Sequence, residues 1–336
     1  MMTRFLNITT IVLFAAMLWL PVLDNALDID PGRKVNEQRA IATMEKLEEA
    51  HPGFLNLPTR IETFFNDRFG MRNSLIHWHN FIRVFGFRIG PGGIYDIPDA
   101  VGGEASRRSS SNVVVGQDGW LFFAGYDNRV LADHRGIVSF SEDELMRWKI
   151  RLLERRNYLR KRGIEYVFVM APDKHSIYPE FLPVHVNQVS DQSRADQLVA
   201  YLQSETDLNI VDPRPALLEA KKSERIYHKT DTHWNALGAH VAYTEIMDAL
   251  RPAFPQLQAR PRSDYELTSR VTDGRDMAGF LALTFSFEEN YIELEPLIPG
   301  VAEESTKNML IQNPKRPKFF HPIAYETGNP DLPRAL

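Results

Sequence analysis

The sequence predicts an α/β fold, with a mostly parallel sheet flanked by helices, and three observations carry this prediction. Residues 164–170 form a short, β-rich and mostly apolar run, which is typical of a strand covered on both faces of a parallel sheet. A second short strand is predicted over residues 208–211. Amphipathic segments with helical spacing lie before and after these runs, and strands that alternate with helices indicate an α/β domain from about residue 113 onward.

The chain begins with an apolar segment that predicts export. Arg4 is followed by residues 5–23, which carry no charge, and three acidic residues lie between positions 24 and 30. A positive charge before an apolar run of about 20 residues directs the following chain away from the cytoplasm. We therefore expect an uncleaved signal anchor that forms a membrane helix, with a signal peptide cleaved near Asn25 as the alternative.

The next segment is predicted to be helical and to end in a loop. Residues 35–49, 61–69 and 75–85 carry the spacing of amphipathic helices. In the third of these, His77 and His79 fall on different faces, so we expect one in the core and one at the surface. Residues 102–111, which are rich in Gly and Ser, then predict a loop.

Local signals define the elements of the α/β domain. Asp118-Gly119, between two β-rich runs, predicts a hairpin over residues 113–123. Ser141 and Glu144 form a capping box that begins a long helix, and Gly163 ends it. Further helices are predicted over residues 192–203, after Pro213, and from Asn235 to Leu250.

The last part of the chain gives weaker signals. Residues 251–318 contain several prolines and mixed short runs, from which we predict no element. Leu332 to Leu336 look like the first residues of a strand, so we expect that the final strand of the fold is missing. The predicted domains are a signal anchor or signal peptide (1–30), a helical region with a loop (31–110) and an incomplete α/β domain (111–336).

Composition excludes several classes of function. A net charge of −5 and the lack of long basic runs give no reason to expect nucleic acid as a partner. The absence of cysteine excludes disulfides, thiolate nucleophiles and zinc–thiolate sites. No cofactor is predicted.

Asp231 and His233 are the candidate catalytic residues. Two residues apart on an extended loop, they can project to the same side, where the carboxylate holds the imidazole in one tautomer. The second ring nitrogen can then take a proton from a nucleophile. The alternative is a loop at the start of a helix in which Asp231 is a local cap.

A metal site is a second, less favoured interpretation of the same loop. His228, Asp231, His233 and His240 together offer imidazole and carboxylate ligands that would suit zinc or a harder ion. His240 lies farther along the following helix, however, and the chain has no H-E-x-x-H pattern. We therefore predict no metal.

A second candidate segment follows the strand predicted over residues 164–170. In open α/β sheets, ligands bind beyond the carboxyl ends of the strands, where Lys174 and Tyr178 would contact an anionic or hydroxyl-rich substrate. A proline-rich loop that packs on itself explains the segment equally well. Ser176 lacks a flanking glycine turn and is a poor nucleophile candidate. Trp234, next to His233, is the third candidate substrate contact.

Three stretches, in this order, resemble one family: residues 116–122, residues 171–180, and Asp231-Thr232-His233-Trp234-Asn235. They are similar to the SGNH-hydrolase-like domain of the alginate O-acetyltransferases AlgJ and AlgX. Residues 65–72 and 274–277 also fit. The resemblance covers the chain from about Phe65 to its C-terminus, and the ordered set is far more specific than any single stretch.

The resemblance implies a periplasmic enzyme, held at the inner membrane by the N-terminal segment, that transfers acetyl groups to hydroxyls of a uronic-acid exopolysaccharide. It implies a permuted SGNH arrangement in which the nucleophilic Ser comes after the strand expected at Leu332 to Leu336. No residue of this chain can be assigned that role, so we expect the 336-residue chain to be inactive as an acetyltransferase. It also implies an inner-membrane transporter of the acetyl donor as a partner.

Two other functions stay open at this point. A non-catalytic polysaccharide-binding or assembly protein of the cell envelope would use the same cleft without a nucleophile. A carbohydrate esterase would pass the acyl group to water.

Overall fold

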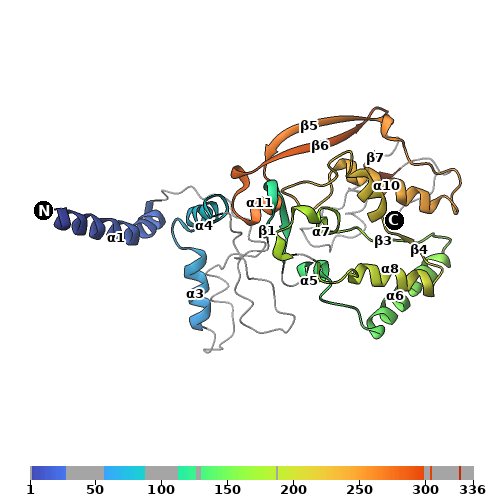
Figure 1. The fold of residues 1–336 in the computed structure, drawn as a ribbon, viewed down its shortest axis with the longest axis horizontal. Coiled ribbons are helices and arrows are strands. Elements are labelled where there is room, and N and C mark those ends of the chain that lie inside the picture. The colour runs from blue at the N-terminus through green and yellow to red at the C-terminus, as the bar shows by residue number, and fades with distance from the viewer. Residues whose placement is uncertain are drawn as a thin grey trace.

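The computed structural model describes residues 2–27, 57–87, 113–125, 130–186, 188–298, 303–304 and 325–326. Figure 1 shows a helical N-terminal part on one side and an α/β part on the other, with a long two-stranded ribbon along one edge of the α/β part. The predicted helix over 35–49, the Gly- and Ser-rich loop and the strand expected at Leu332 to Leu336 lie outside the described residues.

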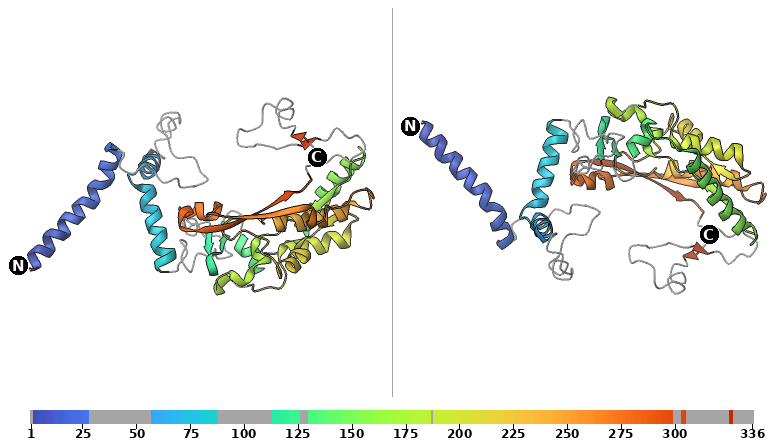
Figure 2. Two further views of the ribbon diagram at one scale, coloured as in Figure 1. Left: turned by 90° about the horizontal axis from the view of Figure 1, so that it is seen from above. Right: turned by 90° about the horizontal axis from the view of Figure 1, so that it is seen from below.

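Helix α1, Met2–Leu27, is the apolar N-terminal segment. Its window Asn7–Asp24 has a mean hydropathy of 1.7 and is long and apolar enough to cross a membrane, a test that a signal sequence also passes. In all three views α1 extends away from the α/β part, and its described apolar side chains are almost all exposed (Figures 1 and 2). The helix is therefore a candidate anchor.

Two of the helices predicted in the N-terminal region are present as α3, Leu57–Asp67, and α4, Arg72–Phe81, which continues into the π-helical turn Ile82–Gly86. His77 is buried and its Nδ1 lies 2.7 Å from the carbonyl oxygen of Ala282. His79 is exposed, which confirms the expected division between core and surface. The contact with Ala282 joins α4 to the α/β part of the chain.

The predicted hairpin is confirmed. Strands β1, Val113–Val115, and β2, Leu121–Phe123, pair antiparallel across a 3₁₀ turn over Gln117–Gly119. Asp118 and Gly119 have φ angles of 53° and 79°, the left-handed conformation that Asp-Gly turns favour. One face of the hairpin packs on the short helix α11, Asp276–Phe280, through Leu121 and Met277.

The parallel pairing is also confirmed, although the strands are short. Strand β3, Val167–Val169, pairs parallel with β4, Asn209–Val211. The strand predicted over 164–170 was expected to be covered on both faces, but β3 is half-buried throughout. Helix α6, Glu142–Arg160, begins with the predicted capping box at Ser141, and Gly163 follows it with a φ of 71°.

Helices surround this small sheet. The remaining helices are α5, Val130–Arg135; α7, Lys174–Ile177; α8, Arg194–Glu205; α9, Arg214–Ala220; and α10, Ala236–Leu250; 3₁₀ turns cover Pro179–Phe181, Val184–Val186, Arg262–Asp264 and Thr284–Ser286. The main core cluster includes Trp120, Ile177 and Leu237, and so joins the β1–β2 hairpin to α7 and α10.

A long hairpin forms where the sequence predicted no element. Strand β5, Tyr265–Asp273, pairs antiparallel with β6, Glu288–Pro296, over nine residues each. Most side chains of both strands are exposed or half-buried, so no clean apolar alternation marks them in the sequence. Figure 2 shows this ribbon lying over the helices of the α/β part. Two short strands, β7, Glu303–Glu304, and β8, Tyr325–Glu326, form a separate antiparallel pair.

Candidate active site

The loop that carries Asp231 and His233 is closed at its base by backbone pairing. Tyr227 and Trp234 form an isolated antiparallel bridge, and the Asn235 N–H donates to the carbonyl of Ile226 at 3.0 Å. Asn235 caps α10, because its side-chain oxygen accepts from the N–H groups of Leu237 and Gly238. The cap ties the start of the helix to the end of the loop, so the loop position is set by α10.

Asp231 and His233 lie side by side, as the sequence predicted. The Oδ1 atom of Asp231 is 2.6 Å from Nδ1 of His233 and also accepts from the His233 backbone N–H at 3.1 Å. The Asp231 side chain is 8% exposed, whereas the His233 ring is 76% exposed. Asp231 therefore fixes the ring through Nδ1, and Nε2 makes no hydrogen bond within the described residues. We call this pair the dyad.

Arg275 holds the other oxygen of Asp231. Its Nε donates to Asp231 Oδ2 at 2.7 Å, and its guanidinium lies over the ring of Tyr291, 4.6 Å from the centroid. Burial by itself would raise the pKa of Asp231, but the hydrogen bonds from Arg275 and His233 outweigh burial and lower this pKa far below its ordinary value. The carboxylate of the dyad is therefore ionised across the physiological range.

Asp276 fixes the residue between the two members of the dyad. Its carboxylate accepts from the Thr232 N–H at 3.1 Å and from the Thr232 hydroxyl at 2.9 Å. Burial and the nearby charge of Asp231 raise the pKa of Asp276. Neither Arg275 nor Asp276 was assigned a role from the sequence, although the stretch 274–277 was part of the resemblance.

Lys174 lies beneath the loop, which corrects its prediction as a substrate contact. Lys174 is 3% exposed, and its Nζ donates to the carbonyl oxygens of His228, Lys229 and Asp231 at 2.9, 3.0 and 2.7 Å. Burial lowers the pKa of the amine to about 7. Below that pH the amine is an ammonium, whose three N–H bonds match the three carbonyl oxygens. Lys174 supports the loop instead of facing substrate.

Tyr178 is placed in the core for a similar reason. It is buried against Trp120, and its hydroxyl oxygen accepts from the Ile226 N–H at 3.0 Å, next to the base of the loop. Direct contact with a substrate, as predicted, does not fit this burial. Trp234 is half-buried and lines the same cavity as His233, and its role as a substrate contact stays a prediction.

Glu289 on β6 is a buried acid that sequence reasoning missed. It is 0% exposed and accepts from the N–H and hydroxyl of Thr230, both at 2.8 Å, and from Arg225 at 2.7 Å. Burial opposes its ionisation, yet its interactions with His228, Thr230 and Arg225 outweigh this and lower its pKa to about 2. No strand is predicted here from the sequence, and nothing in the sequence around Glu289 indicates that its side chain is buried.

The four residues of the metal reading do not converge. His240 lines a different cavity from Asp231 and His233, and its Nε2 lies 3.0 Å from the carbonyl oxygen of Arg260. The His228 ring stacks on Tyr291. Asp231, His233 and Asp276 do place one possible ligand atom each within 4.8 Å of one another. Arg275 already occupies Asp231 Oδ2, and a cation at that distance disfavours a metal ion.

The dyad opens into a cavity of 580 Å³, which we call the dyad cavity. Its lining includes His233, Trp234, Arg275 and Tyr291, with Glu293 and Glu295 of β6 on one wall. No described residue that lines it is a serine or threonine. Ser176 lines a different cavity, at the carboxyl end of β3, so the structure does not bring it to the dyad.

The family model described as "SGNH hydrolase-like domain, acetyltransferase AlgX" matches residues 113–310. The "Probable alginate O-acetylase AlgJ" of Pseudomonas fluorescens is 25% identical over 233 residues, 65% of this chain and 54% of that protein. The protein of the same name from Pseudomonas aeruginosa is 26% identical over 226 residues, 62% of this chain and 53% of that protein. The chain thus spans about half the length of these curated relatives.

Among solved structures, the chain is similar to the O-acetyltransferase domain of Pseudomonas putida AlgJ. The two are 22% identical, the alignment covers 55% of this chain and 66% of that chain, and the TM-score is 0.39. The family match covers more than half of the chain and contains the dyad, Arg275 and Glu289. The chain therefore belongs to the AlgX acetyltransferase family with an SGNH-hydrolase-like domain.

Proposed function

We propose that this chain carries the acid–base half of an O-acetyltransferase that acts on hydroxyls of a uronic-acid exopolysaccharide similar to alginate. The observation that carries the proposal is the dyad: a buried, ionised carboxylate holds an exposed imidazole whose Nε2 has no partner among the described residues. Family membership and the names of the relatives, alginate O-acetylases, support acetyl transfer as the reaction and a polysaccharide as the acceptor.

The proposed chemistry is a two-step acyl transfer. A serine hydroxyl attacks the acetyl carbonyl of the donor as His233 Nε2 takes its proton, and the same proton then goes to the departing donor group. In the second step the sugar hydroxyl gives its proton to Nε2 and attacks the acetyl-serine ester, so the serine leaves and recovers that proton. Asp231 stabilises the imidazolium in both steps, and Arg275 keeps Asp231 ionised.

The serine would come from a further strand that joins β3. Among the described residues, β3 pairs only with β4, yet parallel sheets are usually larger and covered on both faces. A cavity of 390 Å³ lies beside Phe168 and Val169, and buried nitrogens of His134 and His175 in its lining make no hydrogen bond of good geometry with the described part of the chain. Such buried polar atoms need an explanation, which another segment beside β3 would supply.

With this added strand the fold would be a permuted SGNH arrangement, in which the nucleophilic serine follows the dyad in the sequence. Its end would lie near the dyad, because Lys174, just beyond β3, holds the dyad loop. We further propose that α1 anchors the chain to the inner membrane with the domain in the periplasm, since the charges around α1 favour that orientation. An inner-membrane transporter would then bring the acetyl donor.

The test measures acetyl transfer from a chromogenic acetyl ester to a short oligouronate, followed by mass spectrometry of the sugar. The chain alone should show no transfer that depends on His233. The chain fused to a family strand that ends in an Asp-Ser turn should transfer acetyl, and its His233→Ala and Ser→Ala variants should not. Ester cleavage by the unfused chain that disappears with His233→Ala would contradict the proposed supply of the nucleophile. A well-folded fusion without transfer would contradict the enzyme.

One observation favours a second function, that of a non-catalytic polysaccharide-binding protein: the described lining of the dyad cavity includes no serine or threonine. In that case the chain would bind oligouronate equally well with and without the His233→Ala change, and no fusion would transfer acetyl.

A further inference from the structure

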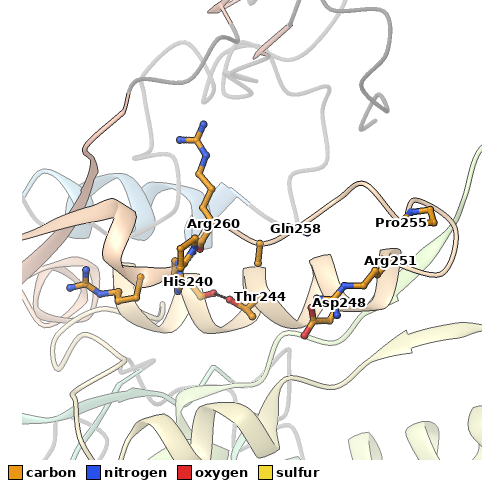
Figure 3. A pocket seen from close by; sticks show the side chains of 10 residues that line it. His240, Thr244, Asp248, Arg251, Pro255, Gln258 and Arg260 are labelled. Atoms are coloured by element: carbon orange, nitrogen blue, oxygen red, sulfur yellow. Dashed lines mark hydrogen bonds and ion pairs between the residues drawn. The ribbon is translucent and has the colours of Figure 1, made fainter.

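We infer that a second cavity, on the outer side of α10, is a subsite that binds the carboxylates of the anionic polysaccharide at a distance from the dyad. This inference rests on the proposed function for the identity of the polymer. The cavity has a volume of 630 Å³ and is lined by α10 and the following loop, with His240, Thr244, Arg251, Gln258, Arg260 and Arg262 among its residues (Figure 3). We call it the arginine cavity.

Two of its guanidinium groups have no carboxylate partner within the part of the chain that the structure describes. Arg260 Nη1 donates to the carbonyl of Ile298 at 3.2 Å, and Arg262 Nη1 donates to the carbonyl of Tyr265 at 3.1 Å. The Nε of Arg262 is buried and makes no hydrogen bond with any described residue. Arg251, in contrast, is paired with Asp248, as Figure 3 shows. The arginine cavity therefore keeps two guanidinium charges that no described carboxylate neutralises.

These groups suit a carboxylate. The planar guanidinium presents parallel N–H bonds that match the two oxygens of a carboxylate, and hydrogen bonds between charged groups are stronger than neutral ones. Arg260 points out from the helix, while the His240 ring binds the Arg260 carbonyl and so fixes the loop (Figure 3). Gln258 and Thr244 add polar groups that suit the hydroxyls of a sugar.

One face of α10 connects the arginine cavity to the dyad cavity. Ala236 lines the dyad cavity, and His240, Thr244, Asp248 and Arg251 line the arginine cavity. Residues three and four apart lie on the same side of a helix, so these five form one continuous row. At 1.5 Å per residue the row is about 22 Å long, which lets one polymer chain occupy both cavities.

The charges differ between the two ends of this row. Glu293 and Glu295 on the β6 wall of the dyad cavity disfavour a carboxylate there, and Arg270 neutralises only Glu293. A uronate polymer would therefore place a hydroxyl at His233 and its carboxylates at Arg260 and Arg262. Inorganic phosphate and anionic lipid headgroups share the negative charge, but neither is long enough to occupy both cavities at once.

The test is the affinity of the whole chain for a short oligouronate, measured by calorimetry at two salt concentrations. The double variant Arg260→Gln/Arg262→Gln should bind at least about tenfold more weakly and lose part of the salt dependence, as expected when charged hydrogen bonds are removed. The matched control is Arg147→Gln/Arg151→Gln, which removes two exposed charges from α6 and should change affinity less than about twofold.

Further arms separate the ligand sources and the two proposals. A neutral oligosaccharide and inorganic phosphate should bind weakly, and anionic vesicles should bind without sensitivity to the Arg260/Arg262 change. Equal weakening by both double variants, or vesicle binding that depends on Arg260 and Arg262, would overturn the subsite. Binding needs no nucleophile, so this measurement tests the subsite even if acetyl transfer is never observed. Circular dichroism and the unfolding midpoint of each variant identify any that is misfolded, and Arg→Lys at both positions should then recover part of the affinity.

Discussion

Arg275 donates Nε to Oδ2 of Asp231, the oxygen that His233 leaves unused, at 2.7 Å. The carboxylate is thus held from both sides: Arg275 fixes one oxygen while the other accepts from the His233 ring and backbone. Since burial alone would raise the pKa of Asp231, Arg275 is the group that most lowers it again. The orientation of the imidazole therefore depends on a residue 44 positions away in the sequence.

Replacement of Arg275 by Ala should raise the pKa of Asp231. Asp231 would then be protonated over a wider acidic range, so the pH at which the dyad loses its ionised carboxylate should move upward. A ¹³C NMR titration of the Asp231 carboxyl measures this shift. Arg270→Ala is the matched control, because Arg270 also lies over the Tyr291 ring, at 5.2 Å, but makes no contact with Asp231. Equal titrations of Asp231 in both variants would show that Arg275 does not control its ionisation.

Replacement of Lys174 by Met should destabilise the protein by about 2–4 kcal/mol, because three carbonyl oxygens under the loop lose their donor. The pH dependence has a definite sign. The folded pKa is lowered to about 7 from 10.5, so the unfolded chain binds more protons between these values and wild-type stability rises with pH there.

The Lys174→Met variant should lack this rise. Urea unfolding between about pH 6 and pH 10 measures both effects. Lys229→Met, whose Nζ donates to a single exposed carbonyl of Asp118, should cost little. A Lys174→Met protein as stable as wild type would mean that water replaces the amine.

Replacement of Glu289 by Gln should remove an acid-sensitive part of the stability. The folded pKa is lowered to about 2 from 4.5, so the carboxylate contributes about 3 kcal/mol above pH 4.5, and this is lost as pH falls toward 2. Urea unfolding at a series of pH values should give a shallower acid dependence for Glu289→Gln. Glu288→Gln, at the neighbouring exposed position, should keep the wild-type slope. Parallel curves for all three proteins would refute the role of Glu289.

Replacement of Asp276 by Asn tests the clamp on Thr232. The folded pKa of Asp276 is raised, so the folded state binds more protons than the unfolded chain above 3.8, and this group costs stability as pH rises through its folded pKa. The Asn variant should lose this decline, while the hydrogen bond to the Thr232 hydroxyl weakens and the loop becomes more mobile.

Hydrogen exchange of the Thr232 and His233 amides should therefore be faster in Asp276→Asn, although the unfolding free energy at neutral pH changes little. Asp273→Asn, an exposed change near the same segment, should affect neither quantity. Unchanged exchange at Thr232 would show that Asp276 does not hold the loop.

Local patterns in the sequence were enough to place several elements. The capping box at Ser141, the Asp118-Gly119 turn and the start of a helix at Asn235 depend on residues within a few positions of one another, and each is found where it was predicted. The pairing of Asp231 with His233 belongs to the same class, because two side chains on one short loop need no distant partner to meet.

Only the tertiary structure decided what surrounds the dyad. Arg275, Glu289 and Lys174 lie 44 to 59 positions from the loop residues that they bind, and no spacing in the sequence links them. The same separation explains why the prediction for Lys174 was wrong. A charged residue that follows a strand was expected to contact substrate at the surface, but it is buried under the loop. The β5–β6 hairpin was missed because its mostly exposed strands carry no apolar alternation. Short-range order is encoded in residue spacing, whereas burial and ion pairing depend on which distant segments the fold brings together.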